Sequence, residues 1–269
     1  MPTLVHYSVE GSVARLTLDS PDNRNALSTA LVNQLHQGLT DAAEEAGVRA
    51  VVLDHTGGTF CAGADLTQAA SGGPAVDPGH LAVDRARELT QLLRRILKLP
   101  MPVIAAVDGH ALGAGAELAY AADFRIGTPS VRIGNPETGL GILAAAGASW
   151  RLKELVGEPV AKEMLLAGSV LRAERALAVN LITEIHEPSD LMAAAHSLAD
   201  RIATQDPLAV RITKSVFHAP AEAHPLIDQL AQGILFESQA KFDRMQTFLD
   251  KKSAKKSEKK SAKEPGKQK

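Results

Sequence analysis

Residues 103–122, VIAAVDGHALGAGAELAYAA, decide the fold class of this chain. The apolar run Val103–Val107 is typical of a buried strand, and a Gly-rich turn follows it. Residues 116–122 have the composition of a helix, with Glu117 in the first turn. A strand, a Gly-rich turn and a helix in this order predict one crossover unit of an α/β sheet, whose ligands bind where the strands end.

The same alternation of strands and helices continues outward from this stretch. Two alternating runs on either side of Glu10-Gly11 predict a hairpin, and Ser28 is in position to cap a helix. Beyond Asp123 the strands become short, and from Ala144 the sequence is mainly helical. The expected elements are strands at 4–9, 14–18, 49–54 and 182–185 and helices at 27–46 and 81–97. Together they predict an α/β fold with largely parallel, buried strands.

The chain divides into three predicted regions. Residues 1–190 form the α/β core, and residues 191–250 are helical. Within the helical region, the amphipathic stretch Leu226–Leu249 suits either a core-covering helix or a helix that packs against a neighbouring subunit. Residues 251–269 repeat KKSA and KKSE, and we expect this Lys-rich tail to be disordered because it contains little apolar area to bury.

Composition and charge exclude several classes of protein. Cys61 is the only cysteine among 269 residues, so an internal disulfide and a multi-cysteine metal site are excluded. No apolar run approaches the roughly 18 residues of a membrane span, and the N-terminal residues lack a secretory leader, which predicts a cytoplasmic protein. The tail carries nine Lys and two Glu, a net +7, so residues 1–250 carry −9. Any weak contact with a polyanion is therefore expected from the tail.

Three segments place small residues and an acid after a predicted strand. They are FCAGADL (60–66), GHALGAGAEL (109–118) and NPETGLG (135–141). Each has an ordinary structural explanation: Asp65 as a helix cap, Glu117 as a favourable charge at a helix start, and Glu137 as a solvated loop acid. His110 is likewise explained as a structural histidine.

Taken together, these segments resemble the enoyl-CoA hydratase/isomerase (crotonase) superfamily. The resemblance covers residues 4–250 and includes PDNRNAL (21–27) and WRLKELVGEPVAKEMLLAG (150–168). It implies a ββα spiral core with a C-terminal helical trimerisation region, in a homotrimer or hexamer. It also implies an acyl-CoA thioester substrate with no metal and no cofactor apart from the coenzyme A of the substrate.

The resemblance also implies roles for individual residues. Glu117 and Glu137 match the two catalytic acids of family hydratases, and the backbone N–H groups of Ala62 and Ala114 match an oxyanion hole. The expected coenzyme A and substrate contacts are Arg24, Ala26, Ala62, Gly63, Ala64, Asp65, Leu66, Gly113 and Gly141.

Two acids favour hydration of a 2-enoyl-CoA, because one carboxylate takes a proton from water while the other supplies one at Cα. Isomerisation of a double bond needs only one proton shuttle. An isomerase, a retro-aldol lyase, a thioester hydrolase and a non-catalytic acyl-CoA binding protein remain alternatives. Two departures from family hydratases bear on the substrate: alanines at 114 and 116, and the stretch Leu143–Trp150 in place of a Pro and a Gly-rich turn.

Overall fold

The computed structural model describes residues 2–65, 67 and 78–261. Within it the chain forms two compact units, residues 1–205 and residues 206–269. The boundary lies after Gln205 and not at residue 190, because α7 (Leu191–Ala203) packs on the sheet of the first unit. None of the helices in the described part is long and apolar enough to cross a membrane.

The first unit contains two sheets. The larger one has β1 and β2 as an antiparallel hairpin at its edge, as predicted, and parallel pairing across the remaining strands. Its strands, in spatial order, are β1 (Val5–Glu10), β2 (Val13–Leu18), β3 (Ala50–His55), β5 (Val103–Val107), β7 (Phe124–Gly127) and β10 (Glu184–Ile185). The smaller sheet contains β4 (Thr59–Cys61), β6 (His110–Leu112), β8 (Arg132–Gly134) and β9 (Val170–Arg172), with β8 and β9 antiparallel.

The chain runs as a spiral of ββα repeats, which confirms the predicted α/β fold. Each turn places one strand in the larger sheet, the next in the smaller sheet, and then forms a helix. The repeats are β3–β4–α3, β5–β6–α4 and β7–β8–α5, with α3 at Pro78–Leu97, α4 at Ala114–Ala121 and α5 at Ala148–Leu166. The carboxyl ends of β4, β6 and β8 consequently lie side by side.

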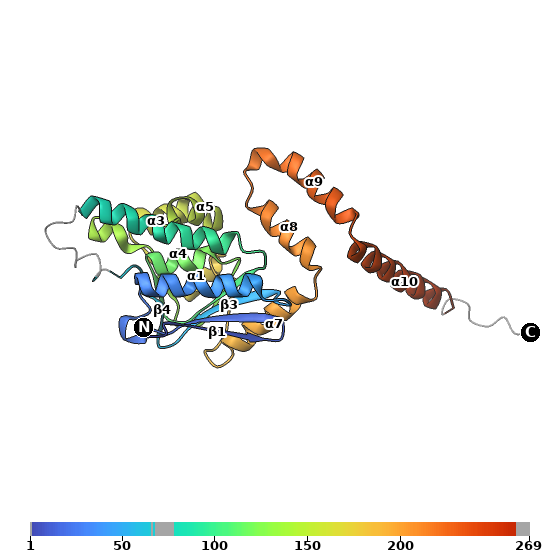
Figure 1. Ribbon diagram of the computed structural model, residues 1–269, viewed down its shortest axis with the longest axis horizontal. Helices are drawn as coiled ribbons and strands as arrows, with labels where there is room; N and C mark the ends of the chain where they lie inside the picture. Colours follow the sequence, from blue (N-terminus) through green and yellow to red (C-terminus); the bar gives the residue numbers. More distant parts are fainter. Residues whose placement is uncertain (1, 66, 68–77, 262–269) are drawn as a thin grey trace, which may run out of the picture. The chain divides into compact units, whose positions relative to one another are not determined.

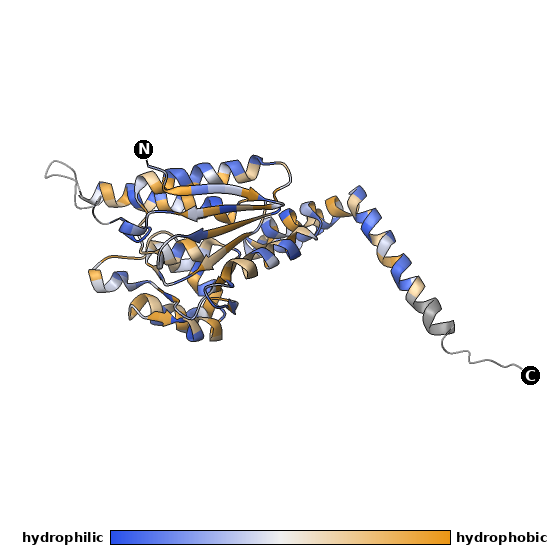
Figure 2. Ribbon diagram, turned by 90° about the horizontal axis from the view of Figure 1, so that it is seen from below, coloured by the Kyte–Doolittle hydropathy of each residue, from blue (hydrophilic) through white to orange (hydrophobic). Residues whose placement is uncertain are grey.

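Alternation along the strands builds a core on both faces of the larger sheet. In β5, Val103, Ala105 and Val107 join the cluster formed with α1 (Thr29–Glu44), α3 and α4, whereas Ile104 and Ala106 pack against α7. Figure 1 shows α1 and α3 over one face and α7 on the other, and Figure 2 shows the hydrophobic character of the strands between them. Ser28 caps α1, as predicted, by accepting from the Leu31 N–H at 3.2 Å.

The second unit is entirely helical in its described part. The stretch predicted as one amphipathic element is divided, because Ser238 Oγ accepts from the Lys241 N–H at 3.3 Å and starts a new helix. Its helices are α8 (Pro207–Phe217), the short 3-10 helix η3 (Ala221–Ala223), α9 (His224–Phe236) and α10 (Gln239–Ser261).

The prediction of disorder in the Lys-rich tail is wrong for residues 251–261, which continue α10. Lys, Ala and Glu are good helix formers, and elongation of an existing helix avoids the cost of nucleating a new one. The rest of the predicted tail, residues 262–269, lies outside the described residues.

Candidate active site

The helix α4 lies unusually close to β4. Gly113 links β6 to α4 with φ +56°, a conformation that side chains disfavour. A β-carbon on Gly115 would overlap the carbonyl group of Cys61 in β4, so glycine is required there for the backbones to meet. This contact fixes the N-terminus of α4, where the first-turn N–H groups have no intrahelical acceptor.

The segment that follows β4 also packs against the N-terminus of α4. A β-carbon on Gly63 would lie 3.0 Å from the Leu112 carbonyl oxygen and 3.7 Å from the Ala114 nitrogen. Two chain segments separated by about fifty residues in sequence therefore bring their backbone groups together at the start of α4.

Ala64, and not Ala62, offers a free donor there. The Ala62 N–H donates to the Arg24 carbonyl oxygen at 3.0 Å, so its predicted role as an oxyanion donor is wrong. Ala64 forms a parallel bridge with Leu27. In this bridge Leu27 forms backbone hydrogen bonds with Gly63 and Asp65, the two residues that flank Ala64. The N–H of Ala64 itself therefore points away from Leu27. No described residue accepts a hydrogen bond from this N–H or from that of Ala114. The sequence motif alone does not show which N–H the neighbouring segment occupies.

Glu117 is buried in the first turn of α4, with only 2 % of its surface exposed. Its Oε1 accepts from the Ala146 N–H at 3.0 Å and the Ala148 N–H at 2.8 Å, at the start of α5. Burial, reinforced by the nearby charge of Glu137, raises the pKa of Glu117 to about 7, while these backbone donors limit the rise. A carboxyl group with this pKa can both donate and accept a proton near neutrality.

Glu137 lies in the 3-10 helix Pro136–Leu140 and reaches the same helix terminus. Its Oε1 accepts from the Asn135 side chain at 3.3 Å and would lie 3.1 Å from a β-carbon on Gly113. Its Oε2 is buried and has no hydrogen-bond partner among the described residues. Burial raises the pKa of Glu137, and the Asn135 contact opposes this rise. The two predicted acids therefore meet at one place.

A chain of hydrogen bonds from Tyr120 through Asn135 orients the Glu137 side chain. Asn135 is buried, and its Oδ1 accepts from the Tyr120 hydroxyl at 3.0 Å. Because this bond leaves the Asn135 amide nitrogen directed at Glu137, the pair orients the carboxylate. Sequence reasoning missed Tyr120, since an apolar helix gave no sign that its hydroxyl is used.

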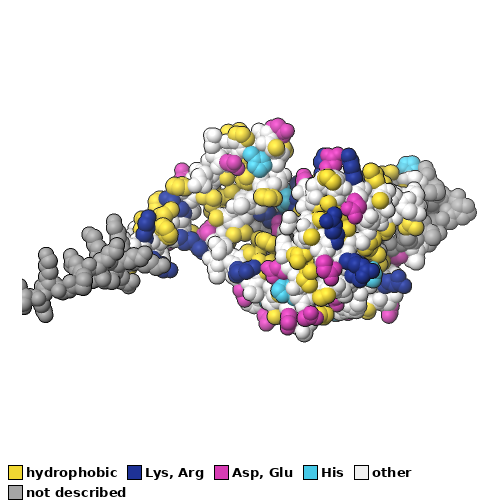
Figure 3. Space-filling model, turned by 180° about the vertical axis from the view of Figure 1, so that it is seen from behind, with side chains coloured by type: hydrophobic (Ala, Val, Ile, Leu, Met, Phe, Trp, Pro, Cys, Tyr) yellow, Lys and Arg dark blue, Asp and Glu magenta, His cyan; other side chains and the backbone are white. Residues whose placement is uncertain are grey.

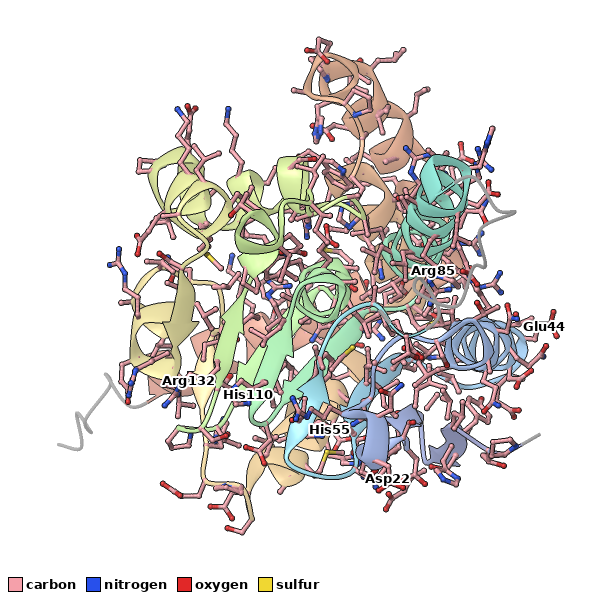
Figure 4. The ribbon with its side chains drawn as sticks, turned by 90° about the vertical axis from the view of Figure 1, so that its left-hand side faces the viewer. Asp22, Glu44, His55, Arg85, His110 and Arg132 are labelled. Atoms are coloured by element: carbon pink, nitrogen blue, oxygen red, sulfur yellow. The ribbon has the colours of Figure 1, made fainter. Side chains whose placement is uncertain are left out.

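The predicted coenzyme A segment is held next to β4 by Asn25. The buried Asn25 side chain donates to the carbonyl groups of Thr56 and Thr59 at 3.0 and 2.8 Å and accepts from the Ser20 N–H at 2.7 Å. Arg24 and Asn25 both adopt positive φ, which turns the exposed Arg24 side chain outward and leaves Ala26 buried. On α3, Arg85 donates to the Leu27 carbonyl group and ties this segment down (Figure 4).

The remaining predicted residues have other surroundings. Asp65 is buried, and its carboxylate accepts from Asn23 and from both the N–H and hydroxyl of Thr67, which supports its structural role as a cap. Gly141 is exposed and ends the 3-10 helix of Glu137 with φ +73°. His110 is exposed at the start of β6 beside Arg132 (Figure 4).

The predicted contact of Leu66 cannot be placed on this site. Leu66 lies outside the described residues. Within the described ranges, no group of three His, Cys, Asp or Glu side chains is arranged to hold a metal ion.

Comparison with known proteins identifies the family. Residues 8–261 match the family described as enoyl-CoA hydratase/isomerase. The chain belongs to this family. A crystal structure of enoyl-CoA hydratase from Bacillus anthracis superimposes with a TM-score of 0.86 at 30 % identity, covering 93 % of this chain and 97 % of that one. The predicted crotonase-type fold is thus confirmed.

Named relatives of this family member span nearly its whole length. A short-chain-enoyl-CoA hydratase of Clostridium acetobutylicum is 31 % identical over 90 % of this chain and 93 % of its own length. A 2,3-dehydroadipyl-CoA hydratase of Escherichia coli is 34 % identical, also over 90 % of this chain and 93 % of its own length. The chain is therefore similar to hydratases whose names give different acyl groups.

The burial of Glu117 predicts a specific pH dependence of stability. The carboxyl group has a pKa of about 7 in the folded protein against 4.5 as its ordinary value, so the folded state binds the proton more tightly. The free energy of unfolding should therefore fall as pH rises from about 4.5 to about 7. The Glu117→Gln variant should not show this loss of stability. Its free energy of unfolding should exceed that of the wild type by up to about 3 kcal/mol at pH 8 and differ little from it at pH 4.5.

Urea denaturation across this pH range measures the difference, and the exposed Glu174→Gln serves as the control. A Glu117→Gln variant that is less stable than the wild type at pH 8 would show that the carboxylate is stabilised, not destabilised, by its surroundings.

Proposed function

We propose that the protein is an enoyl-CoA hydratase, a hydro-lyase that adds water across the double bond of a 2-enoyl-CoA thioester to give a 3-hydroxyacyl-CoA. The observation that carries this proposal is the meeting of two carboxyl groups with raised pKa values at the start of α4. Both lie beside the unpaired backbone donors of Ala64 and Ala114.

The donors suit the charge that develops during hydration. Addition of water to an α,β-unsaturated thioester passes through an enolate-like species with negative charge on the thioester oxygen. The Ala64 and Ala114 N–H groups would bind this oxygen, and the positive end of the α4 dipole adds to their effect. A fixed donor of this kind contributes roughly 3 to 4 kcal/mol to the transition state.

The two carboxyl groups divide the proton transfers. One takes a proton from the attacking water, and the other gives a proton to Cα, so the pair returns to its starting total charge after each turnover. Raised pKa values and mutual repulsion favour a pair that shares one proton near neutral pH. The unpartnered Oε2 of Glu137 is available to a water molecule or to the substrate.

The presence of both acids favours hydration over isomerisation, because isomerisation needs only one group that shuttles a proton. Isomerisation of 3-enoyl-CoA remains the second candidate because the same donors would stabilise the same enolate.

The coenzyme A part of the substrate is assigned to the surface formed by the segment after β4 and by the start of α4. We propose contacts from Arg24, whose exposed cation suits a phosphate, and from the backbone between Ala62 and Asp65. Ala26, Gly113 and Gly141 complete the proposed lining of the coenzyme A and acyl sites together.

Replacement of either acid tests the mechanism. Glu117→Gln and Glu137→Gln should each lower the hydration rate of crotonyl-CoA by at least about 100-fold, because glutamine cannot transfer a proton. Affinity for butanoyl-CoA should stay within a few-fold, and the double variant should lose less than the product of the two effects. Product analysis by mass spectrometry with 2-enoyl and 3-enoyl thioesters measures both activities.

Glu174→Gln, at an exposed site on α6 (Ala173–Ala178), is the matched control. Near wild-type hydration by either active-site variant would refute the two-acid mechanism. Turnover of only the 3-enoyl thioester, dependent on a single acid, would instead identify an isomerase.

We also propose that the chain assembles as a homotrimer, alone or stacked as a hexamer. The helices of the second unit expose large apolar side chains, a feature of association surfaces (Figure 3). They are Leu208, Phe217, Leu226, Leu230, Ile234, Phe236, Phe242, Met245, Phe248 and Leu249.

Sedimentation velocity tests the assembly. The wild type should sediment as three or six copies of the 28.4 kDa chain, and Leu230→Asp with Phe248→Asp should shift it toward smaller species. Gln229→Asp, at an exposed neighbouring position on α9, should not. A monomeric wild type at micromolar concentration would contradict this proposal.

A further inference from the structure

Ten consecutive residues that follow Glu137 contain no polar side chain. Residues 139–148 read GLGILAAAGA and form a connection without regular secondary structure over most of their length. Leu140, Ile142 and Leu143 are exposed within it. Surface connections are ordinarily rich in polar residues, so an exposed apolar one indicates an apolar ligand or partner.

The two ends of this segment lie next to the two proposed catalytic carboxyl groups. It starts two residues after Glu137, and its last residues donate the Ala146 and Ala148 N–H groups to Glu117. Anything bound between the two carboxylates therefore lies next to this segment.

Trp150 extends the apolar surface beyond the Glu117 donors. A β-carbon on Gly147 would lie 3.7 Å from Trp150 Cζ2 and 3.8 Å from Leu93 Cδ1, so the indole ring folds back over Gly147 next to α3. Trp150 remains partly exposed, whereas Leu93 is buried. We call residues 139–148 together with Trp150 the apolar strip.

We propose that the apolar strip binds the acyl chain and selects unsubstituted hydrocarbon chains longer than four carbons. This inference rests on the proposed function, which places the thioester carbon at the backbone donors and the next two carbons between the acids. A four-carbon chain then has one carbon left, so only longer chains reach the exposed leucines and Trp150.

The absence of charged side chains from the apolar strip also selects against acyl chains that end in a carboxylate. The nearest cation in sequence, Arg151, is buried and already engaged with the Tyr120 carbonyl group and with Glu154. A carboxylate at the far end of the acyl chain would lose water on the apolar strip without gaining a partner from it. Acyl groups with a terminal carboxylate should therefore gain nothing from their extra length.

Isothermal titration of the intact protein with saturated, unreactive thioesters tests this inference. Octanoyl-CoA should bind at least about tenfold more tightly than butanoyl-CoA because its additional methylene groups are partly buried. Adipyl-CoA should bind no more tightly than butanoyl-CoA.

Two leucines of equal exposure provide a matched pair of variants. Leu143 is 71 % exposed in the apolar strip, and Leu166 is 72 % exposed at the far end of α5. Leu143→Asp should reduce the octanoyl-to-butanoyl affinity ratio to below about threefold, whereas Leu166→Asp should leave the ratio unchanged.

Equal affinity for octanoyl-CoA and butanoyl-CoA, or equal effects of the two variants, would overturn the inference. A Leu143→Asp variant with altered oligomeric mass and an unchanged ratio would also overturn it, because the strip would then be an interface between copies. Binding of saturated thioesters requires no turnover. An intact chain-length ratio without hydration would therefore reject only the proposed function.

Discussion

The close approach of α4 to β4 is the constraint on which the site depends. A side chain at Gly115 would collide with the Cys61 carbonyl group, and one at Gly63 would press against β6. Because both positions are glycine, the N–H groups of Ala64 and Ala114 come together at one helix terminus. The spiral of ββα repeats supplies the neighbouring strands, and β8 delivers Glu137 to the same point. The site is thus a consequence of backbone packing, and its donors require no particular side chain.

The electrostatics of Glu117 result from two opposed effects. Burial among apolar side chains disfavours the charged carboxylate, whereas the backbone donors at the start of α5 favour it. Their balance leaves the pKa near neutrality, where proton transfer in both directions is efficient. Full solvation would leave the group a weak base, and complete burial without donors would keep it permanently protonated. The same segment that provides the donors also carries the apolar strip, so the proposed proton transfer and the proposed acyl selection depend on one connection.

Much of the fold was predictable because it is encoded locally. The hairpin, the Ser28 cap, the strand Val103–Val107 and the position of Glu117 follow from periodicity and capping chemistry over a few residues. The choice of Ala64 over Ala62 was not predictable, because it depends on which N–H the distant Arg24 segment occupies. The role of Asn25 and the support of Glu137 by Tyr120 likewise depend on contacts between segments. The helical state of residues 251–261 was missed because composition was weighed without the helix that precedes it.

A crystal structure with acetoacetyl-CoA bound would test the central claim most directly. The account predicts the thioester oxygen within about 2.7–3.1 Å of both the Ala64 and Ala114 nitrogens. It also places the second and third acyl carbons between the carboxyl groups of Glu117 and Glu137. A thioester oxygen bound elsewhere, or a third carbon out of reach of both acids, would contradict the proposed arrangement.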